Sequence, residues 1–275
     1  MALFIALGVA GLIVLLVAAM MVRRILSEGF IRRIARHLEA EPSGDVFREE
    51  MVADLPAPAK RYLLHAIKPG TPLARSVRLR MSGSLRSRSD AEWTRVRAEE
   101  TLSAPEGFVW TASVQKGWKR FRGSDFYFNG EARARFWLWG FIPASRVEGA
   151  AAVRTAAGKL AIESMWMPSC LLPQAGAQWE AVDDRAARVI VTIGGEPATI
   201  TLQVEPDGSL RRAKITQTGA NAEGSSAFVP FQADVEEERE FSGYTVPAIV
   251  SIGWWVRPGQ YLEFFKASLL EARHT

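Results

Sequence analysis

The sequence predicts an α+β protein in which an N-terminal transmembrane helix precedes a large curved antiparallel β-sheet with helices packed on one side. Three observations lead to this fold class. Residues 2–22 carry no charged or polar side chain, several runs between residues 76 and 218 alternate apolar with polar positions, and residues 144–172 are rich in alanine. Alternation with a period of two is typical of strands with one buried and one solvated face, and such strands form antiparallel sheets.

The apolar run at residues 2–22 is long enough to cross a bilayer, because its 21 residues span about 30 Å as a helix. A buried core helix is one alternative, although core helices of this length usually keep a polar face. A cleaved signal is the other, with Ala18 and Ala19 near a possible cleavage site. We expect a single-pass membrane anchor.

Residues 23–39 form a basic amphipathic flank. Their apolar residues recur at helical spacing, and the arginines lie between them and after the anchor: Arg23, Arg24, Arg32, Arg33 and Arg36. Such a helix either lies in the membrane interface near anionic headgroups or packs on the domain with its basic face solvated. We therefore expect a transmembrane helix at 1–22, a basic juxtamembrane helix and linker at 23–45, and a single β-rich domain at 46–275.

Charge and motif content argue against several classes of function. The 275 residues carry a net charge of +4, of which the flank holds +3 (five arginines and two glutamates), so the rest is nearly neutral and no nucleic-acid partner is expected. Cys170 is the one cysteine and there are three histidines, so we expect no disulfide, metal or cofactor. The sequence contains no HExxH, GxSxG, P-loop or GxGxxG motif.

The elements follow in order. A helix with prolines in its first turn is expected from residue 54 to about residue 67, after a linker at 41–45. A strand follows at 76–86, and residues 186–204 and 202–218 each read as a hairpin around a glycine turn. Residues 144–172 predict one or two helices across the sheet, and residues 246–256 and 261–269 a last strand pair. About nine or ten strands are expected in total.

Two groups of charged residues have alternating positions. Arg78, Arg80 and Arg86 share one face of a strand, and Glu236, Glu238 and Glu240 share one face of another. If these strands are neighbours, the groups pair across them. If they are apart, the arginine face is solvated or meets anionic lipid.

Nine tryptophans are more aromatic mass than a small core usually needs, so a curved sheet with an incomplete lid would leave an apolar ligand cavity. Residues 136–143 hold two Trp, two Phe and no charge. They are either a buried strand or, if exposed, a contact with the bilayer or the rim of the cavity.

Two motifs resemble a known family. Residues 55–63, LPAPAKRYL, and residues 163–169, ESMWMPS, resemble the LPxPxxRYL and ExxWxPS motifs of a bacterial family catalogued only as a domain of unknown function. The resemblance extends over about residues 50–270 and departs at Phe231, where many members carry Trp. It implies a fold similar to the half-barrel of the lipoprotein carriers of the bacterial envelope, with a hydrophobic ligand held between a curved sheet and helices.

These observations predict a single-pass protein of the bacterial inner (cytoplasmic) membrane that binds a membrane lipid or another hydrophobic small molecule, with no protein partner indicated. The positive-inside rule favours a cytoplasmic domain, whereas the lipoprotein carriers work in the periplasm. A membrane-tethered interaction scaffold is an alternative. Nine residues are candidate ligand contacts: Arg61, Tyr62, Trp110, Asp125, Tyr127, Trp137, Glu163, Trp166 and Trp254.

No catalytic residue is assigned, and a binding protein is favoured over an enzyme. Glu163 is the candidate acid or base of a hydrolase-like alternative, since its apolar surroundings would raise its pKa. Alternatively, Glu163 has a structural role and forms an ion pair with Arg61.

Overall fold

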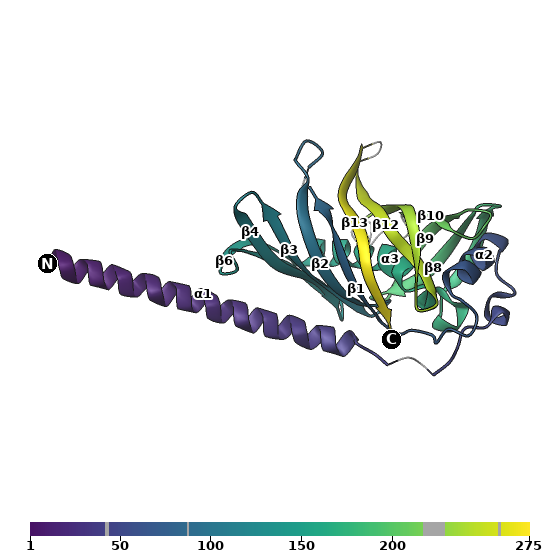
Figure 1. Ribbon diagram of the computed structural model, residues 1–275, viewed down its shortest axis with the longest axis horizontal. Helices are drawn as coiled ribbons and strands as arrows, with labels where there is room; N and C mark the ends of the chain where they lie inside the picture. Colours follow the sequence, from purple (N-terminus) through teal and green to yellow (C-terminus); the bar gives the residue numbers. More distant parts are fainter. Residues whose placement is uncertain (42–43, 87, 217–228, 258–259) are drawn as a thin grey trace.

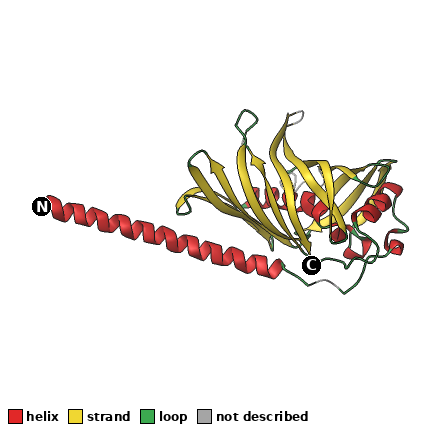
Figure 2. Cartoon of the chain, in the orientation of Figure 1, coloured by secondary structure: helices red, strands yellow, loops and turns green. Residues whose placement is uncertain are grey.

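The computed structural model describes residues 1–41, 44–86, 88–216, 229–257 and 260–275. Within them, one antiparallel sheet of thirteen strands curves around a helix, as Figure 1 and Figure 2 show. The expected α+β fold is thereby confirmed. The strands are β1 (Val77–Leu85), β2 (Thr94–Ser103), β3 (Gly107–Lys116), β4 (Lys119–Phe128), β5 (Glu131–Leu138), β6 (Ile142–Glu148), β7 (Gln178–Asp183), β8 (Ala186–Ile193), β9 (Glu196–Val204), β10 (Leu210–Thr216), β11 (Phe231–Phe241), β12 (Tyr244–Arg257) and β13 (Gln260–His274).

The first and last strands meet in the middle of the sheet. The spatial order is β6-β5-β4-β3-β2-β1-β13-β12-β11-β10-β9-β8-β7, so hairpins run outward from the β1–β13 pair in both directions. This pair joins Val77 to His274 and Leu85 to Phe265. The predicted hairpins over 186–204 and 202–218 are β8–β9 and β9–β10, and the predicted last pair is β12–β13. Residues 217–218 and the turn at 258–259 lie outside the described residues.

The concave face of the sheet carries the core. Helix α3 (Ala150–Glu163) lies there, followed by 3-10 turns at Ser164–Trp166, Pro168–Leu171 and Pro173–Ala175. Small side chains bring α3 close to the sheet: a Cβ on Gly158 would lie 2.8 Å from the carbonyl oxygen of Val229. A 3-10 turn (Glu49–Val52) and helix α2 (Ala57–Ala66) close the other end, where Tyr62 and Leu63 are buried.

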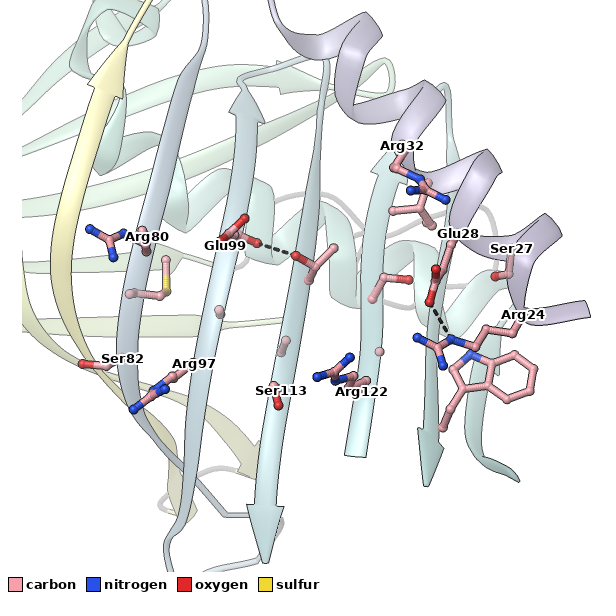
Figure 3. A pocket seen from close by; sticks show the side chains of 18 of the residues that line it. Arg24, Ser27, Glu28, Arg32, Arg80, Ser82, Arg97, Glu99, Ser113 and Arg122 are labelled. Atoms are coloured by element: carbon pink, nitrogen blue, oxygen red, sulfur yellow. Dashed lines mark hydrogen bonds and ion pairs between the residues drawn. The ribbon is translucent and has the colours of Figure 1, made fainter. Parts of the chain in front are cut away.

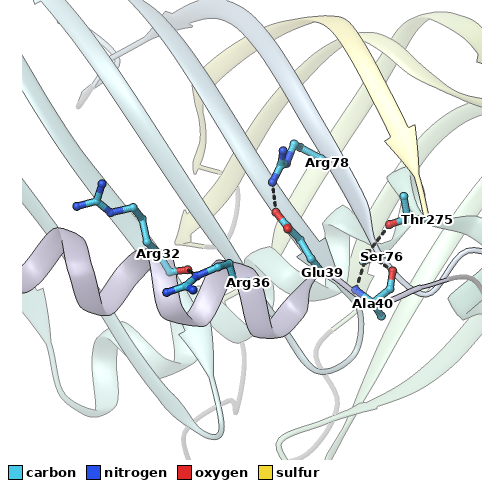
Figure 4. Close-up of polar contacts among 7 residues, drawn as sticks. All are labelled: Arg32, Arg36, Glu39, Ala40, Ser76, Arg78 and Thr275. Carbon is cyan, nitrogen blue, oxygen red and sulfur yellow. Dashed lines mark hydrogen bonds and ion pairs between the residues drawn. The ribbon is translucent and has the colours of Figure 1, made fainter.

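The convex face carries α1 (Ala2–Leu38), one uninterrupted helix that includes both the apolar run and the basic flank. Ile31, Ile34 and Leu38 are buried against Val109 and Phe126 of the sheet. The flank therefore packs on the domain, the second of its two predicted arrangements. Figure 4 shows the end of α1 fastened to β1, where Arg78 pairs with Glu39, and to the chain terminus through Ser76.

Two expectations were wrong, and one open alternative is decided. Residues Ile142–Glu148 are strand β6, so only α3 and the short turns fill the predicted helical region; pairing with β5 overrides the helix propensity of this polar, solvated segment. The sheet has thirteen strands in the described part rather than nine or ten. The arginines of β1 do not face the glutamates of β11, because β13 and β12 lie between them. Arg80 pairs with Glu271 instead.

Candidate functional site

A buried charge cluster lies on the concave face, where α3 meets β2, β3 and β4. Lys159 Nζ lies 2.7 Å from Glu100 Oε1 and 3.3 Å from Glu163 Oε2. The sheet register brings Asp125 into the same cluster, because Glu100 faces Trp110 across β2–β3 and Trp110 faces Asp125 across β3–β4. The Lys159 ammonium also sits 3.6 Å above the centre of the Phe108 ring, a favourable cation–π distance.

Burial sets the protonation of this cluster. It opposes the charge of Lys159, but Glu100, Glu163 and Asp125 together raise the pKa of the ammonium, which stays charged. Burial, aided by the negative charge of Glu100, holds the pKa of Glu163 well above its usual range. Burial also raises the pKa of Asp125 to about 6, against the opposing effect of Lys159. Part of the Asp125 surface stays accessible, which moderates that shift.

The cluster retains unused hydrogen-bonding capacity. Among the described residues, Glu100 Oε2 is buried and has no hydrogen-bond partner, and Glu163 Oε2 is buried with no polar contact beyond its 3.3 Å ion pair with Lys159. Unpaired buried polar atoms are costly, so such atoms mark a place where a water or a ligand group is favoured. In the described part of the chain, no group of three or more His, Cys, Asp or Glu side chains is arranged to hold a metal ion.

The concave face ends in a half-buried apolar mouth towards the β1–β2, β3–β4 and β12–β13 turns. Trp254 stacks on Phe264 with ring centres 4.4 Å apart, and Phe136 lies 6.4 Å from Trp110. Phe136 covers Gly123 so closely that a Cβ there would lie 2.5 Å from the ring. The mouth consists of inward-facing side chains that the core covers only in part: Leu85, Trp110, Phe121, Phe136, Trp254 and Phe264.

Two exposed tryptophans form the tips of neighbouring hairpins beside this mouth. Trp118 is in the β3–β4 turn and Trp139 in the β5–β6 turn; their rings are 5.2 Å apart and they are 74% and 43% exposed. The next residue, Gly140, accepts a hydrogen bond of 2.6 Å from the Arg24 guanidinium of α1. The hairpin tips are thus tied to the helix two residues after its apolar run ends.

A second recess lies on the convex face. A cavity of about 960 Å³, partly open to solvent, lies between α1 and the outward-facing residues of β1 to β5. Figure 3 shows side chains that line it. Its lining mixes apolar surface with five arginines and several hydroxyl-bearing side chains. A smaller cavity of about 140 Å³ lies beside Cys170 on the concave side.

The structure brings three of the predicted site residues together: Trp110, Asp125 and Glu163 surround Lys159. Trp254 lies at the mouth, and Tyr127 lies on the concave face under Gly194. Trp166 is fully buried and donates a hydrogen bond of 2.9 Å to the Pro247 carbonyl.

The remaining predicted site residues lie elsewhere. Tyr62 is buried on α2, and Arg61 donates to the Asp184 carbonyl at 2.7 Å. The expected ion pair between Arg61 and Glu163 was wrong, since Lys159 occupies that place one helical turn away. Trp137 faces the convex cavity, because its position in β5 alternates with the inward-facing Phe136.

Sequence reasoning missed Lys159 and Glu100. Lys159 precedes Glu163 by four residues in an alanine-rich helix, the spacing of a helical ion pair. Glu100 occupies an apolar register position between Ala98 and Leu102 in an alternating strand. Each is visible as a charge at a position that the local pattern assigns to the core.

Fold and site define a class of protein: a curved open sheet wrapped around a helix, with charges buried at its centre and an apolar mouth at one end. The particular family follows from the sequence match, since residues 53–274 match a family of unknown function, DUF6920, and the chain belongs to it. The predicted family resemblance is therefore confirmed. No curated protein matches the sequence.

Several solved structures are similar in fold. A LolA superfamily protein from Nitrosomonas europaea aligns with a TM-score of 0.44 and 9% identity over 79% of this chain and 92% of its own. A putative outer membrane lipoprotein-sorting protein domain from Vibrio parahaemolyticus gives a TM-score of 0.34 and 7% identity over 72% and 85%. A DUF1329 family protein from Desulfovibrio piger gives 0.30 and 11% over 73% and 86%.

Proposed function

We propose that α1 anchors this protein in a membrane and that the mouth of the concave face binds a lipid or another apolar molecule. The observation that carries the proposal is the position of the mouth. The half-buried aromatic side chains of the mouth lie next to the hairpin tips that carry Trp118 and Trp139. Arg24, just after the apolar run of α1, donates a hydrogen bond to Gly140 in one of these tips. Apolar side chains thus lie between the level of the hairpin tips and the interior of the sheet.

The anchor is supported by the length, composition and exposure of α1. It is long and apolar enough to cross a membrane, and none of the described side chains in its apolar run is buried. Arg24 lies about 3 Å beyond Val22 along the helix axis. The headgroup region on each side of a bilayer is about 5–8 Å thick, so Gly140 and its neighbour Trp139 are at headgroup level.

Trp118 and Trp139 support the same placement. Tryptophan favours the membrane–water interface because its ring is apolar and its N–H seeks a polar partner. Basic residues flank Trp118, which suits an anionic headgroup layer: Lys116, Lys119 and Arg120. The membrane is proposed to be the bacterial inner membrane, with the domain on the cytoplasmic side by the positive-inside rule.

The ligand class follows from the lining of the concave face. Aromatic and aliphatic side chains at the mouth suit an acyl or prenyl chain. The unused carboxyl oxygen of Glu100, deeper in the face, suits one small polar group, such as a hydroxyl. A large charged headgroup does not fit among groups that are already paired with Lys159.

Uptake of diacylglycerol by the delipidated full chain in detergent, followed by native mass spectrometry, tests the proposal. Phe136→Glu places a charge in the mouth, and we expect it to weaken uptake about tenfold or more. Val182→Glu, on the exposed surface of β7, is the matched control and should take up the lipid as the wild type does. Failure of the wild type to bind, or equal uptake by Phe136→Glu, would contradict the proposal.

A further inference from the structure

The convex cavity has the chemistry of a phosphate site. Five arginines and two glutamates line it: Arg24, Arg32, Arg80, Arg97, Arg122, Glu28 and Glu99. Arg24 pairs with Glu28, and Arg80 pairs with Glu271 outside the cavity. Among the described residues, Arg32, Arg97 and Arg122 have no ion-pair partner. Of the two glutamates in the lining, only Glu99 has no ion pair within the described residues. The cavity therefore holds three unpaired positive charges and one unpaired negative charge.

The sheet register sets the spacing of two of these charges. Arg97 of β2 faces Ser113 of β3, and Ser113 faces Arg122 of β4. Neighbouring strands are about 4.8 Å apart, so the two arginines arise about 10 Å apart with a hydroxyl between them. Two like charges about 10 Å apart in a solvated recess repel each other weakly, and an anion between them would turn this repulsion into attraction. Guanidinium groups at this spacing can both donate to one phosphate.

The rest of the lining supplies neutral donors and a wall. Hydroxyl groups of Ser82, Thr111 and Ser124 line the same cavity. Helix α1 forms its other side with Ser27, Ile31 and Arg32, and Arg32 projects towards the sheet in Figure 3. The cavity thus exists only while α1 is docked. Arg24, which ties the helix to the hairpin tips at headgroup level, is part of its rim.

We infer that this cavity binds the phosphate group of an anionic ligand, and that the ligand is the headgroup of a membrane phospholipid next to the anchor. The choice of a lipid rests on the proposed function, since it requires that α1 spans the membrane. The phosphate chemistry itself rests on the arginine row alone. The site is separate from the concave mouth, which lies on the other face of the sheet.

The test uses the full chain in a non-ionic detergent, with binding measured by native mass spectrometry for phosphatidylglycerol and phosphatidylcholine. The wild type should prefer phosphatidylglycerol about tenfold, and the preference should fall at high ionic strength. The double variant Arg97→Gln with Arg122→Gln should lose this preference. The matched control Arg48→Gln with Arg188→Gln removes the same charge from exposed positions elsewhere and should keep it.

The outcomes separate the possible sources of the phosphate. If inorganic phosphate displaces phosphatidylglycerol at a concentration equal to that of the lipid, the site belongs to a soluble phosphate compound. If displacement requires a much higher phosphate concentration, the result supports the lipid headgroup. Equal binding of both lipids by the wild type, or an unchanged preference in the arginine variant, overturns the inference. Diacylglycerol uptake by the arginine variant should remain normal, so failure of this site is distinguishable from failure of the concave mouth.

Discussion

The concave and convex faces of the sheet differ in how their charged side chains are balanced. On the concave face Lys159 is surrounded by Glu100, Glu163 and Asp125, and burial raises the pKa values of Glu163 and Asp125, which favours their neutral, protonated forms. In the convex cavity arginines outnumber carboxylates, and within the described residues Arg97 and Arg122 have no ion-pair partner. The difference shows that burial enforces pairing or neutralisation, whereas a solvated recess can keep surplus charge for a ligand.

The largest difference between the faces should appear in stability. Trp166→Ala removes a fully buried ring and its hydrogen bond to Pro247 on the concave side, which should lower the free energy of unfolding by about 4 kcal/mol. Denaturant unfolding measures it. Trp118→Ala, at an exposed hairpin tip, is the control and should change it by less than about 1 kcal/mol. Equal losses would show that the concave side is not the core that stabilises the domain.

The buried charges should make stability depend on pH. The carboxyl of Asp125 has a pKa of 3.8 when exposed and about 6 in the fold, so its contribution is fully present below about pH 4 and is lost as the pH rises through 6. The loss is at most about 3 kcal/mol. Asp125→Asn removes this titration, so its stability relative to the wild type should increase between pH 4 and pH 7 in thermal or denaturant unfolding. A constant difference across that range would mean that Asp125 is solvated.

The convex side should detach without unfolding the sheet. Ile34→Ala reduces the small cluster that holds α1 to Val109 and Phe126, at a cost of about 2 kcal/mol to docking of the helix. Hydrogen exchange in residues 31–38 should rise while exchange in β12 and β13 stays slow. Ile25→Ala, exposed on the same helix, is the control. Loss of protection throughout the sheet would show that α1 is part of the core.

The smallest effect is expected from the surface ion pair of Arg80 with Glu271. Both side chains are largely solvated, so Arg80→Gln should change the free energy of unfolding by at most about 1 kcal/mol. A double-mutant cycle with Glu271→Gln measures the coupling. A coupling of several kcal/mol would mean that the convex face is less accessible to water than its exposure indicates.

Much of the fold was predictable because it is local. The period of two in residues 76–86, the glycine turns of the β8–β9 and β9–β10 hairpins and the prolines at the start of α2 each specify their element within a few neighbours. Strand β6 was not predictable from the sequence, since it leads into an alanine-rich run that favours a helix and only pairing with β5 makes it a strand. The pairing of β1 with β13 was also not predictable from the sequence, because nearly two hundred residues separate the two strands.

The residues of the candidate sites were likewise predictable only where the signal is local in the sequence. Residues Trp110, Asp125 and Glu163 were recognisable as polar or aromatic groups in apolar surroundings. Their partner Lys159 was overlooked because an exposed helical lysine has the same local sequence as a buried one. The pairing of Arg97 with Ser113 and Arg122 depends on strand order, and the wall that α1 adds depends on the direction in which the helix leaves the membrane.

The sequence by itself determined the apolar helix, the alternation that makes the sheet two-faced, and membership of the family, because each depends on side chains close together in the chain. Tertiary structure alone decided which face α1 covers, which acids surround Lys159 and which arginines line the cavity on the convex face. Those outcomes depend on electrostatic and packing interactions between strands distant in sequence, and such interactions exist only once the sheet has formed and water has been removed from one of its sides.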